Sequence, residues 1–180
     1  MGHRIVRLVT WNCCRGPFEA KAQALAPLNP DIAIIQEAPR PEGKDTPERL
    51  WLGDASRVGI AVLARNGYTV ARASRPTSVT DPVRAVRVSG PVDFNLLAIW
   101  ARADSKYIRG LYDRMQNHVR FARKRPTYYF QWSEAKPFHI DYCFVPQAWR
   151  PLVRSVDIGG YEAWSSLSDH RPVTVELALE

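Results

Sequence analysis

The sequence predicts a mixed α/β sandwich, in which two mainly antiparallel β-sheets pack together and helices flank them, with residues 1–180 forming a single domain. Three observations lead to this fold class. Apolar, β-branched runs recur along the chain, and such runs are typical of buried strands. Most of the runs are joined by turn sequences that indicate hairpins. Only the connection between the first two runs has the pattern of a crossover helix, which argues against a doubly wound parallel sheet.

The first two runs predict buried strands with a helix between them. The strands are RIVRLVTW at residues 4–11 and DIAIIQ at residues 31–36. Residues 17–28 predict the helix, because Pro17 suits a first helical turn and four apolar residues share one face. Those four residues are Phe18, Ala22, Leu25 and Ala26. The dipeptide Asn29-Pro30 ends the helix, since a residue that precedes proline disfavours the helical conformation.

The later strands are predicted as three hairpins and a closing strand. The strongest turn signal is Asn66-Gly67, a dipeptide that favours a two-residue hairpin loop. The paired runs are residues 58–65 with 68–74, residues 83–89 with 94–101, and residues 127–132 with 138–146, and the closing strand is residues 172–179.

A basic amphipathic helix is predicted from Ser105 to Arg125. Its apolar face consists of Ile108, Leu111, Tyr112, Met115, Val119 and Ala122. Its other faces carry cations, among them Arg109, Arg114, Arg120 and Arg123. Two interpretations stay open: the cations form an ordinary solvated face, or the four arginines contact the phosphate backbone of a nucleic acid.

Composition and charge narrow the class of protein. The net charge of +7 and the isoelectric point near 9.6 favour an anionic partner, nucleic acid above all, although charge also serves solubility. No run of about 18 apolar residues is present, so no membrane span is expected. The N-terminus does not have the pattern of a signal peptide. Three cysteines, at spacings unlike those of a zinc site, favour reduced thiols and a cytoplasmic protein.

Five polar residues stand within or next to the predicted strands, and they are the candidate site: Asn12, Glu37, Asp141, Asp169 and His170. Each one alone is compatible with a structural role, as a turn residue, a surface acid or a paired carboxylate. Together they can converge at one rim of a sandwich, because polar residues at strand ends are aimed at the edge of the sheet.

The chemistry of these residue types fits a phosphoester. Glu37 supplies a hard oxygen of the kind that Mg²⁺ prefers, and Asn12 can bind a phosphate oxygen or orient Glu37. Asp169 can hold the imidazole of His170 and stabilise its protonated form. An imidazolium in a fixed position stabilises charge that develops on phosphoryl oxygens. The set therefore predicts metal-assisted hydrolysis of a phosphoester.

The segments TWNCC, DIAIIQEA, VGIAVLAR, HIDYCFVP and SDHRPV, in this order, resemble the endonuclease/exonuclease/phosphatase superfamily with its deoxyribonuclease I-like fold. The resemblance covers nearly the whole chain. It implies a four-layered sandwich, Mg²⁺-dependent (or Mn²⁺-dependent) nuclease or phosphatase activity, and a nucleic acid as partner. It places Asn12 and Glu37 on the family's metal site and Asp169 and His170 on its aspartate–histidine pair. Asp141 falls in a weaker motif, a basic residue followed by Ile-Asp-Tyr.

The chain also departs from the family. A Gly-Asp-Phe-Asn strand end, whose aspartate is implied to activate the attacking water, is missing from the region between about Ala101 and Thr127. VDFN at residues 92–95 comes too early, so Asp93 and Asn95 are interpreted as hairpin-turn residues. We therefore expect a truncated variant of the fold in which half of the catalytic set is absent.

Three functions follow from these patterns. The first is a Mg²⁺-dependent phosphodiester hydrolase of reduced activity, an endonuclease or exonuclease, in which Asp141 is the only nearby acid that could replace the missing base. The second is a non-catalytic, basic domain that binds nucleic acid and keeps a remnant of the site. The third is a phosphatase that acts on a small phosphorylated substrate. No pattern indicates a protein partner.

Overall fold

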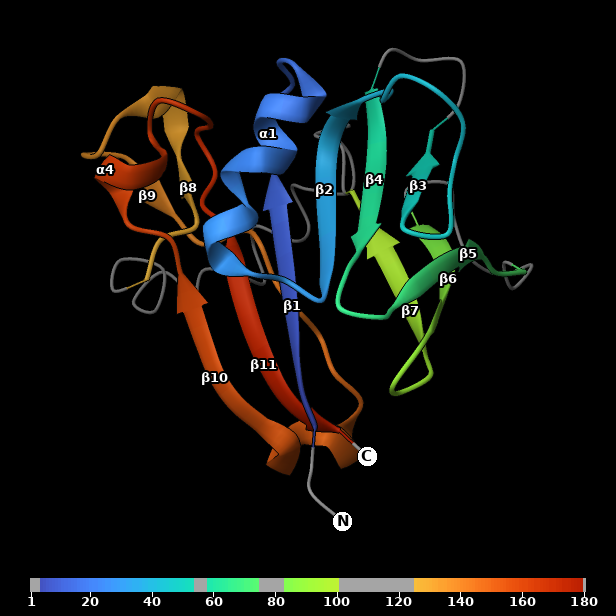
Figure 1. The fold of residues 1–180 in the computed structure, drawn as a ribbon. Helices are drawn as coiled ribbons and strands as arrows, with labels where there is room; N and C mark the ends of the chain where they lie inside the picture. Colours follow the sequence, from blue (N-terminus) through green and yellow to red (C-terminus); the bar gives the residue numbers. More distant parts are fainter. Residues whose placement is uncertain (1–3, 54–57, 75–82, 101–124, 180) are drawn as a thin grey trace.

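A six-stranded β-sheet is the largest element of the computed structural model, which describes residues 4–53, 58–74, 83–100 and 125–179 (Figure 1). In spatial order its strands are β10 (Val153–Ile158), β11 (Val173–Leu179), β1 (Arg4–Asn12), β2 (Ile32–Pro39), β4 (Val58–Ala64) and β3 (Arg49–Leu52). β1 and β2 are parallel and every other pair is antiparallel. The two central strands are thus the pair that the crossover helix predicts.

The crossover helix α1 (Phe18–Ala24), continued by the 3₁₀ turn η1 (Ala26–Leu28), covers one face of this sheet (Figure 1). Phe18, Ala22 and Leu25 are buried against that face, as their spacing predicts. Ala26 is exposed, because it opens η1 and no longer follows the helical repeat. The predicted helix therefore ends one turn early.

A second, three-stranded sheet packs on the opposite face. Its order is β5 (Thr69–Arg72), β6 (Val83–Ser89) and β7 (Phe94–Ile99), and all pairs are antiparallel. Apolar side chains of both sheets, among them Val62 of β4 and Val88 of β6, share one hydrophobic core. The antiparallel pair β6–β7 confirms the predicted hairpin. Asp93 lies in its turn, whereas Asn95 lies inside β7 and is not a turn residue.

Asn66-Gly67 is not the hairpin turn that the dipeptide predicts. Both residues have the expected positive φ angles of 55° and 85°, yet β4 and β5 belong to different sheets. Asn66 Nδ2 donates to Asp31 Oδ1 at 2.8 Å, and Tyr68 is buried in the core between the sheets. Because Tyr68 packs in the core between the two sheets, the chain passes from the first sheet to the second at this turn. Tertiary packing thus overrides the hairpin preference of Asn66-Gly67.

The third predicted hairpin is much shorter than expected. Only β8 (Tyr128–Tyr129) and β9 (Pro137–Phe138) pair, with the 3₁₀ turn η3 (Phe130–Trp132) between them. Residues 139–146 are not a strand. The backbone N–H groups of Ile140 and Asp141 donate to the hydroxyl of Thr127 instead of to a neighbouring strand.

The remaining elements were not predicted, or lie outside the described residues. η4 (Gln147–Leu152) leads into β10, and α4 (Tyr161–Trp164) precedes the loop before β11. β3 and β10 had no clear sequence signal. The predicted helix, with Arg109, Arg114, Arg120 and Arg123, lies outside the described residues except for its last residue, Arg125. Most of the region of the missing motif, residues 101–124, lies outside them too. All three cysteines are free thiols. Within the described ranges no helix has the length and apolar character to cross a membrane.

Candidate active site

Two parallel strands bring the candidate residues to one edge of the large sheet. Asn12 ends β1 and Glu37 lies near the end of the parallel strand β2, so both stand at the same edge. β11 runs antiparallel to β1, and its start therefore lies at this edge too (Figure 1). His170 comes three residues before β11. The strand directions thus gather residues from both ends of the chain.

A β-bulge aims the side chain of Glu37. The register of β2 against β4 shifts between Gln36 and Ala38, and Glu37, the extra residue, has a φ of 53°. A left-handed conformation is uncommon for a residue other than glycine, and bulges of this kind re-aim side chains at functional edges. Asn12 Nδ2 donates to Glu37 Oε1 at 3.1 Å, while Asn12 Oδ1 accepts the N–H of Cys14 at 3.0 Å. Asn12 therefore orients the Glu37 carboxylate.

The turn after β1 contributes a cation and a thiol to this edge. The exposed Arg15 places Nε 3.8 Å from Glu37 Oε2. Burial raises the pKa of the Cys14 thiol to about 11, and the carboxylates of Asp169 and Glu37 add to the shift. Cys14 is consequently a protonated thiol at neutral pH and not an activated nucleophile.

The imidazole of His170 is held by Asp141. Nδ1 lies 2.9 Å from Asp141 Oδ2 and 3.1 Å from Oδ1, and both side chains are largely buried. The sequence neighbour Asp169, which we expected to hold the ring, makes no such bond in the structure. The carboxylate of Asp169 instead contacts the thiol of Cys14, and it reaches His170 only through its charge.

The electrostatics of the pair favour a protonated imidazole. Burial by itself lowers the pKa of His170, but the hydrogen bond and charge of Asp141 outweigh it, with smaller contributions from Asp169 and Glu37. The net result is a pKa raised above the ordinary value of 6.5. The carboxylate of Asp141 therefore stabilises the imidazolium form of His170.

Thr127 and Tyr128 fix the two partners from the β8 side. The buried hydroxyl of Thr127 accepts the N–H of Asp141 at 3.0 Å, and the Thr127 carbonyl accepts the N–H of Arg171 at 2.6 Å. The ring of Tyr128 lies against the imidazole of His170, with centroids 4.6 Å apart. Thr127 thus positions Asp141, and Tyr128, at the start of β8, positions His170.

Ser168 joins the two halves of the site. Its fully buried hydroxyl donates to the carbonyl of Asn12 at 2.8 Å and accepts the N–H of His170 at 3.0 Å. Trp11 Nε1 also donates to the carbonyl of His170, at 3.2 Å. The end of β1, which carries the partner of Glu37, is therefore fixed to the loop that carries the imidazole.

The side chain of Arg171 also stabilises the loop that carries His170. Its side chain is 0% exposed and packs against the contacting rings of Tyr129 and Tyr161, with Cζ 4.6 Å and 4.9 Å from their centroids. Nη1 donates to the carbonyls of Ser168 and His170. The sequence reasoning missed both Ser168 and Arg171. The signal was their place on either side of the Asp-His pair in SDHRPV.

The donor chemistry at Glu37 fits a hard divalent cation that is only partly held by protein. Among the residues that the structure describes, no three His, Cys, Asp or Glu side chains are grouped so as to hold a metal. Mg²⁺ is commonly bound by one or two carboxylates and completes its shell with water and substrate phosphate. The oriented, partly exposed Glu37 carboxylate meets that requirement.

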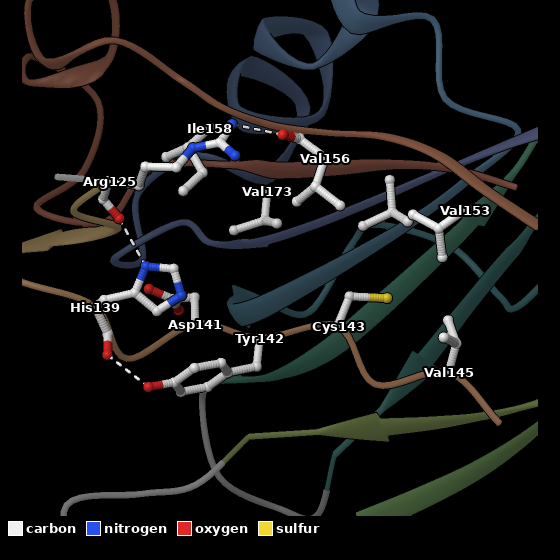
Figure 2. Close-up of a pocket in the computed structure, with 11 residues that line it drawn as sticks. Arg125, His139, Asp141, Tyr142, Cys143, Val145, Val153, Val156, Ile158 and Val173 are labelled. Carbon is white, nitrogen blue, oxygen red and sulfur yellow. Dashed lines mark hydrogen bonds between the residues drawn. The ribbon is translucent and has the colours of Figure 1, made fainter. Parts of the chain in front are cut away.

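A separate pocket, which Asp141 helps to line, lies over β10 and β11 (Figure 2). Its floor is apolar and consists of Val153, Val156, Ile158, Val173 and Val175. At its rim His139 Nδ1 lies 2.6 Å from the carbonyl of Arg125, whose guanidinium donates to the carbonyl of Val156 (Figure 2). An apolar floor does not suit a phosphate, so the candidate active site is the Glu37–His170 edge and not this pocket.

The fold is that of the endonuclease/exonuclease/phosphatase proteins. The endonuclease domain of TRAS1, a telomere-specific non-LTR retrotransposon, matches with a TM-score of 0.66 at 14% identity over 98% of this chain and 99% of its own. A 3′ phosphatase, NExo from Neisseria bound to a product DNA hairpin, matches with a TM-score of 0.65 at 18% identity over 96% and 99%. D. rerio TDP2 complexed with a single-strand DNA product matches at 0.52 and 11% over 96% and 98%.

These likenesses confirm the predicted fold class and, at the level of the fold, the resemblance that the sequence motifs predict. No protein-family model matches the chain, and no curated protein matches its sequence.

Proposed function

We propose that this protein is a metal-dependent phosphodiester hydrolase that acts on nucleic acid, a nuclease of reduced activity. The observation that carries the proposal is the Ser168 bridge, because it holds the Asn12–Glu37 pair and the Asp141–His170 pair at one edge. Solved structures of the same fold include an endonuclease domain, a 3′ phosphatase with a DNA product and TDP2 with single-strand DNA. The net charge of +7 supports an anionic substrate.

In the proposed hydrolase each residue of the site has its own chemical role. Glu37 would hold Mg²⁺, or Mn²⁺, which when bound neutralises charge on a phosphoryl group. Asn12 keeps the Glu37 carboxylate in position. His170, protonated and fixed through Nδ1 by Asp141, donates from Nε2 to a phosphoryl oxygen. Asp169 acts through its charge, which helps to raise the pKa of His170.

Among the residues of the site that the structure describes, no general base is evident. Asp141, the acid that could have replaced the family's water-activating aspartate, is engaged through both carboxylate oxygens with His170. General-base catalysis typically contributes about 10²–10⁴-fold, so slow turnover is expected. This engagement of Asp141 also favours the second candidate function, a domain that binds nucleic acid without hydrolysing it.

Hydrolysis of plasmid DNA and of a small chromogenic phosphodiester, with Mg²⁺, Mn²⁺ or EDTA, tests the proposal. We expect slow, metal-dependent cleavage that is lost in both Glu37→Gln and His170→Ala. A chromogenic phosphomonoester in the same assay separates a phosphatase from a diesterase. Nucleic-acid binding without hydrolysis under any metal would replace the hydrolase with the binding domain.

A further inference from the structure

We propose that the aromatic tip, defined as Phe130 and Trp132 of η3, is a stacking platform for an unpaired base next to the phosphate bound at His170. The inference rests on the proposed function, because it takes nucleic acid as the ligand, and it specifies the form of that ligand. The protein would then prefer single-stranded or frayed nucleic acid to an intact duplex.

The rings of the aromatic tip face solvent. Phe130 is 45% exposed and Trp132 is 48% exposed, and neither belongs to the two hydrophobic cores. Neighbouring residues of β8 behave differently: Tyr129 is buried, and Tyr128 is partly buried against His170. Two large exposed rings two positions apart on one short turn are apolar surface of the kind that marks an interaction site.

The backbone of the tip is held in an uncommon conformation. Gln131 and Trp132 both have positive φ angles, 55° and 56°. For a bulky residue such as tryptophan this conformation is costly and persists only where the surroundings impose it. The surroundings do so here, because the hydroxyl of Tyr161 donates to the carbonyl of Trp132 at 2.6 Å and the N–H of Phe130 donates to the carbonyl of Lys136 at 3.1 Å.

The tip is joined to the candidate active site by contacting rings and by a shared anchor. Tyr128 lies 4.6 Å from the imidazole of His170 and 6.5 Å from the ring of Phe130, centroid to centroid. Tyr161, which holds the carbonyl of Trp132, also packs on Arg171, the cation that holds the His170 loop. A nucleotide whose phosphate meets His170 therefore has the aromatic tip as its neighbour.

The charge at the aromatic tip and the stacking of bases in nucleic acids indicate which form of nucleic acid would bind there. Lys136 Nζ lies 5.5 Å above the ring of Phe130 and donates to Gln131 Oε1 at 2.8 Å, which places a cation for a phosphate beside the stacking surface. In an intact duplex both faces of each base are covered by its neighbours. A free face exists only in single strands, loops and frayed ends, and aromatic side chains stack on such bases with little sequence preference.

Binding of a fluorescent oligonucleotide without hydrolysis tests the inference. The probe is a short single strand that contains one 2-aminopurine, compared with the same sequence in a blunt duplex, both in EDTA. The wild-type protein should bind the single strand more tightly and quench its 2-aminopurine. Phe130→Leu with Trp132→Leu should weaken single-strand binding by about fivefold or more and relieve the quenching. The salt dependence of binding should not change, because no charge is removed.

Phe144→Leu is the matched control, because Phe144 is 84% exposed, stacks on Tyr142 and lies outside the tip. The inference is overturned if the double variant binds and quenches like the wild type, if Phe144→Leu has the same effect, or if the duplex is bound as tightly as the single strand. This binding assay tests only the stacking platform. The proposed hydrolase activity is tested separately, by metal-dependent cleavage of a small chromogenic diester, so the two proposals can fail independently. Quenching without cleavage would support the platform and remove the hydrolase.

Discussion

The side chains of His170 and Asp141 form a close pair, with Nδ1 2.9 Å from Oδ2, although 29 positions separate them in the chain. This pairing leaves Nε2 as the nitrogen of the imidazolium that is available to a substrate oxygen. It also assigns the orienting role to a different carboxylate from the sequence neighbour, Asp169.

Asp141→Asn should reduce hydrolysis more than Asp169→Asn does. The first change removes the acceptor that fixes the ring of His170, and we expect a loss of about 10²-fold or more in kcat. The second removes only a nearby charge. Steady-state kinetics on a chromogenic phosphodiester compare the two variants, and a larger loss in Asp169→Asn would contradict the assigned pairing.

The pKa of His170 should exceed its ordinary value, and activity should fall as pH rises through it. The free energy of unfolding should also fall as pH rises. Because the pKa is raised in the folded state, the stabilisation by the His170–Asp141 pair is fully present below about pH 6.5 and is lost as pH rises through the folded-state pKa. In Asp141→Asn burial dominates, so the pKa should drop. NMR titration of the His170 ring measures both values, and an unchanged pKa in the variant would refute the explanation.

Glu37→Gln should abolish the stabilisation that Mg²⁺ or Mn²⁺ confers. A ligand that binds only the folded state raises the melting temperature by mass action, and the amide lacks the charge that attracts the cation. Thermal unfolding across a metal titration measures the shift. Glu42→Gln, at an exposed position, is the control and should keep it. A full shift in Glu37→Gln would remove this residue from any metal site.

Arg171→Met should lower the free energy of unfolding by about 2–4 kcal/mol, because two carbonyls lose a charged donor in a fully buried place. Arg171→Lys keeps the charge but not the planar guanidinium that packs against Tyr129 and Tyr161, so its free energy of unfolding should lie between those of Arg171→Met and the wild type. Urea unfolding measures all three. Arg150→Met, at an exposed arginine, should change little. A neutral Arg171→Met would show that the loop does not depend on this cation.

Nucleic-acid binding should weaken steeply with salt if Arg109, Arg114, Arg120 and Arg123 contact phosphates. Replacing two of them by glutamine should reduce the slope of log affinity against log salt by about 1.4–1.8. Replacing the exposed Arg150 and Arg154 changes the net charge equally and should leave the slope nearly unchanged. Equal slopes in both double variants would favour a solvated basic face on the predicted helix.

Local patterns were sufficient for four of the six strands of the large sheet and for the five candidate residues, but not for Ser168 and Arg171. The apolar runs predict β1, β2, β4 and β11 because side-chain alternation and burial are encoded within a few residues. Asn12 and Glu37 follow from polar residues at the ends of such runs, and the structure brings them within hydrogen-bond distance. The fold class required only these strands and one crossover helix.

Contacts between distant segments were decided by tertiary structure alone. Burial of Tyr68 turns Asn66-Gly67 into a link between sheets, and the hydroxyl of Thr127 directs Asp141, and not Asp169, to the imidazole of His170. The physical reason is range. Periodicity and turn chemistry report on residues a few positions apart, whereas the partner of a buried polar group is whichever distant side chain the packed strands bring to it.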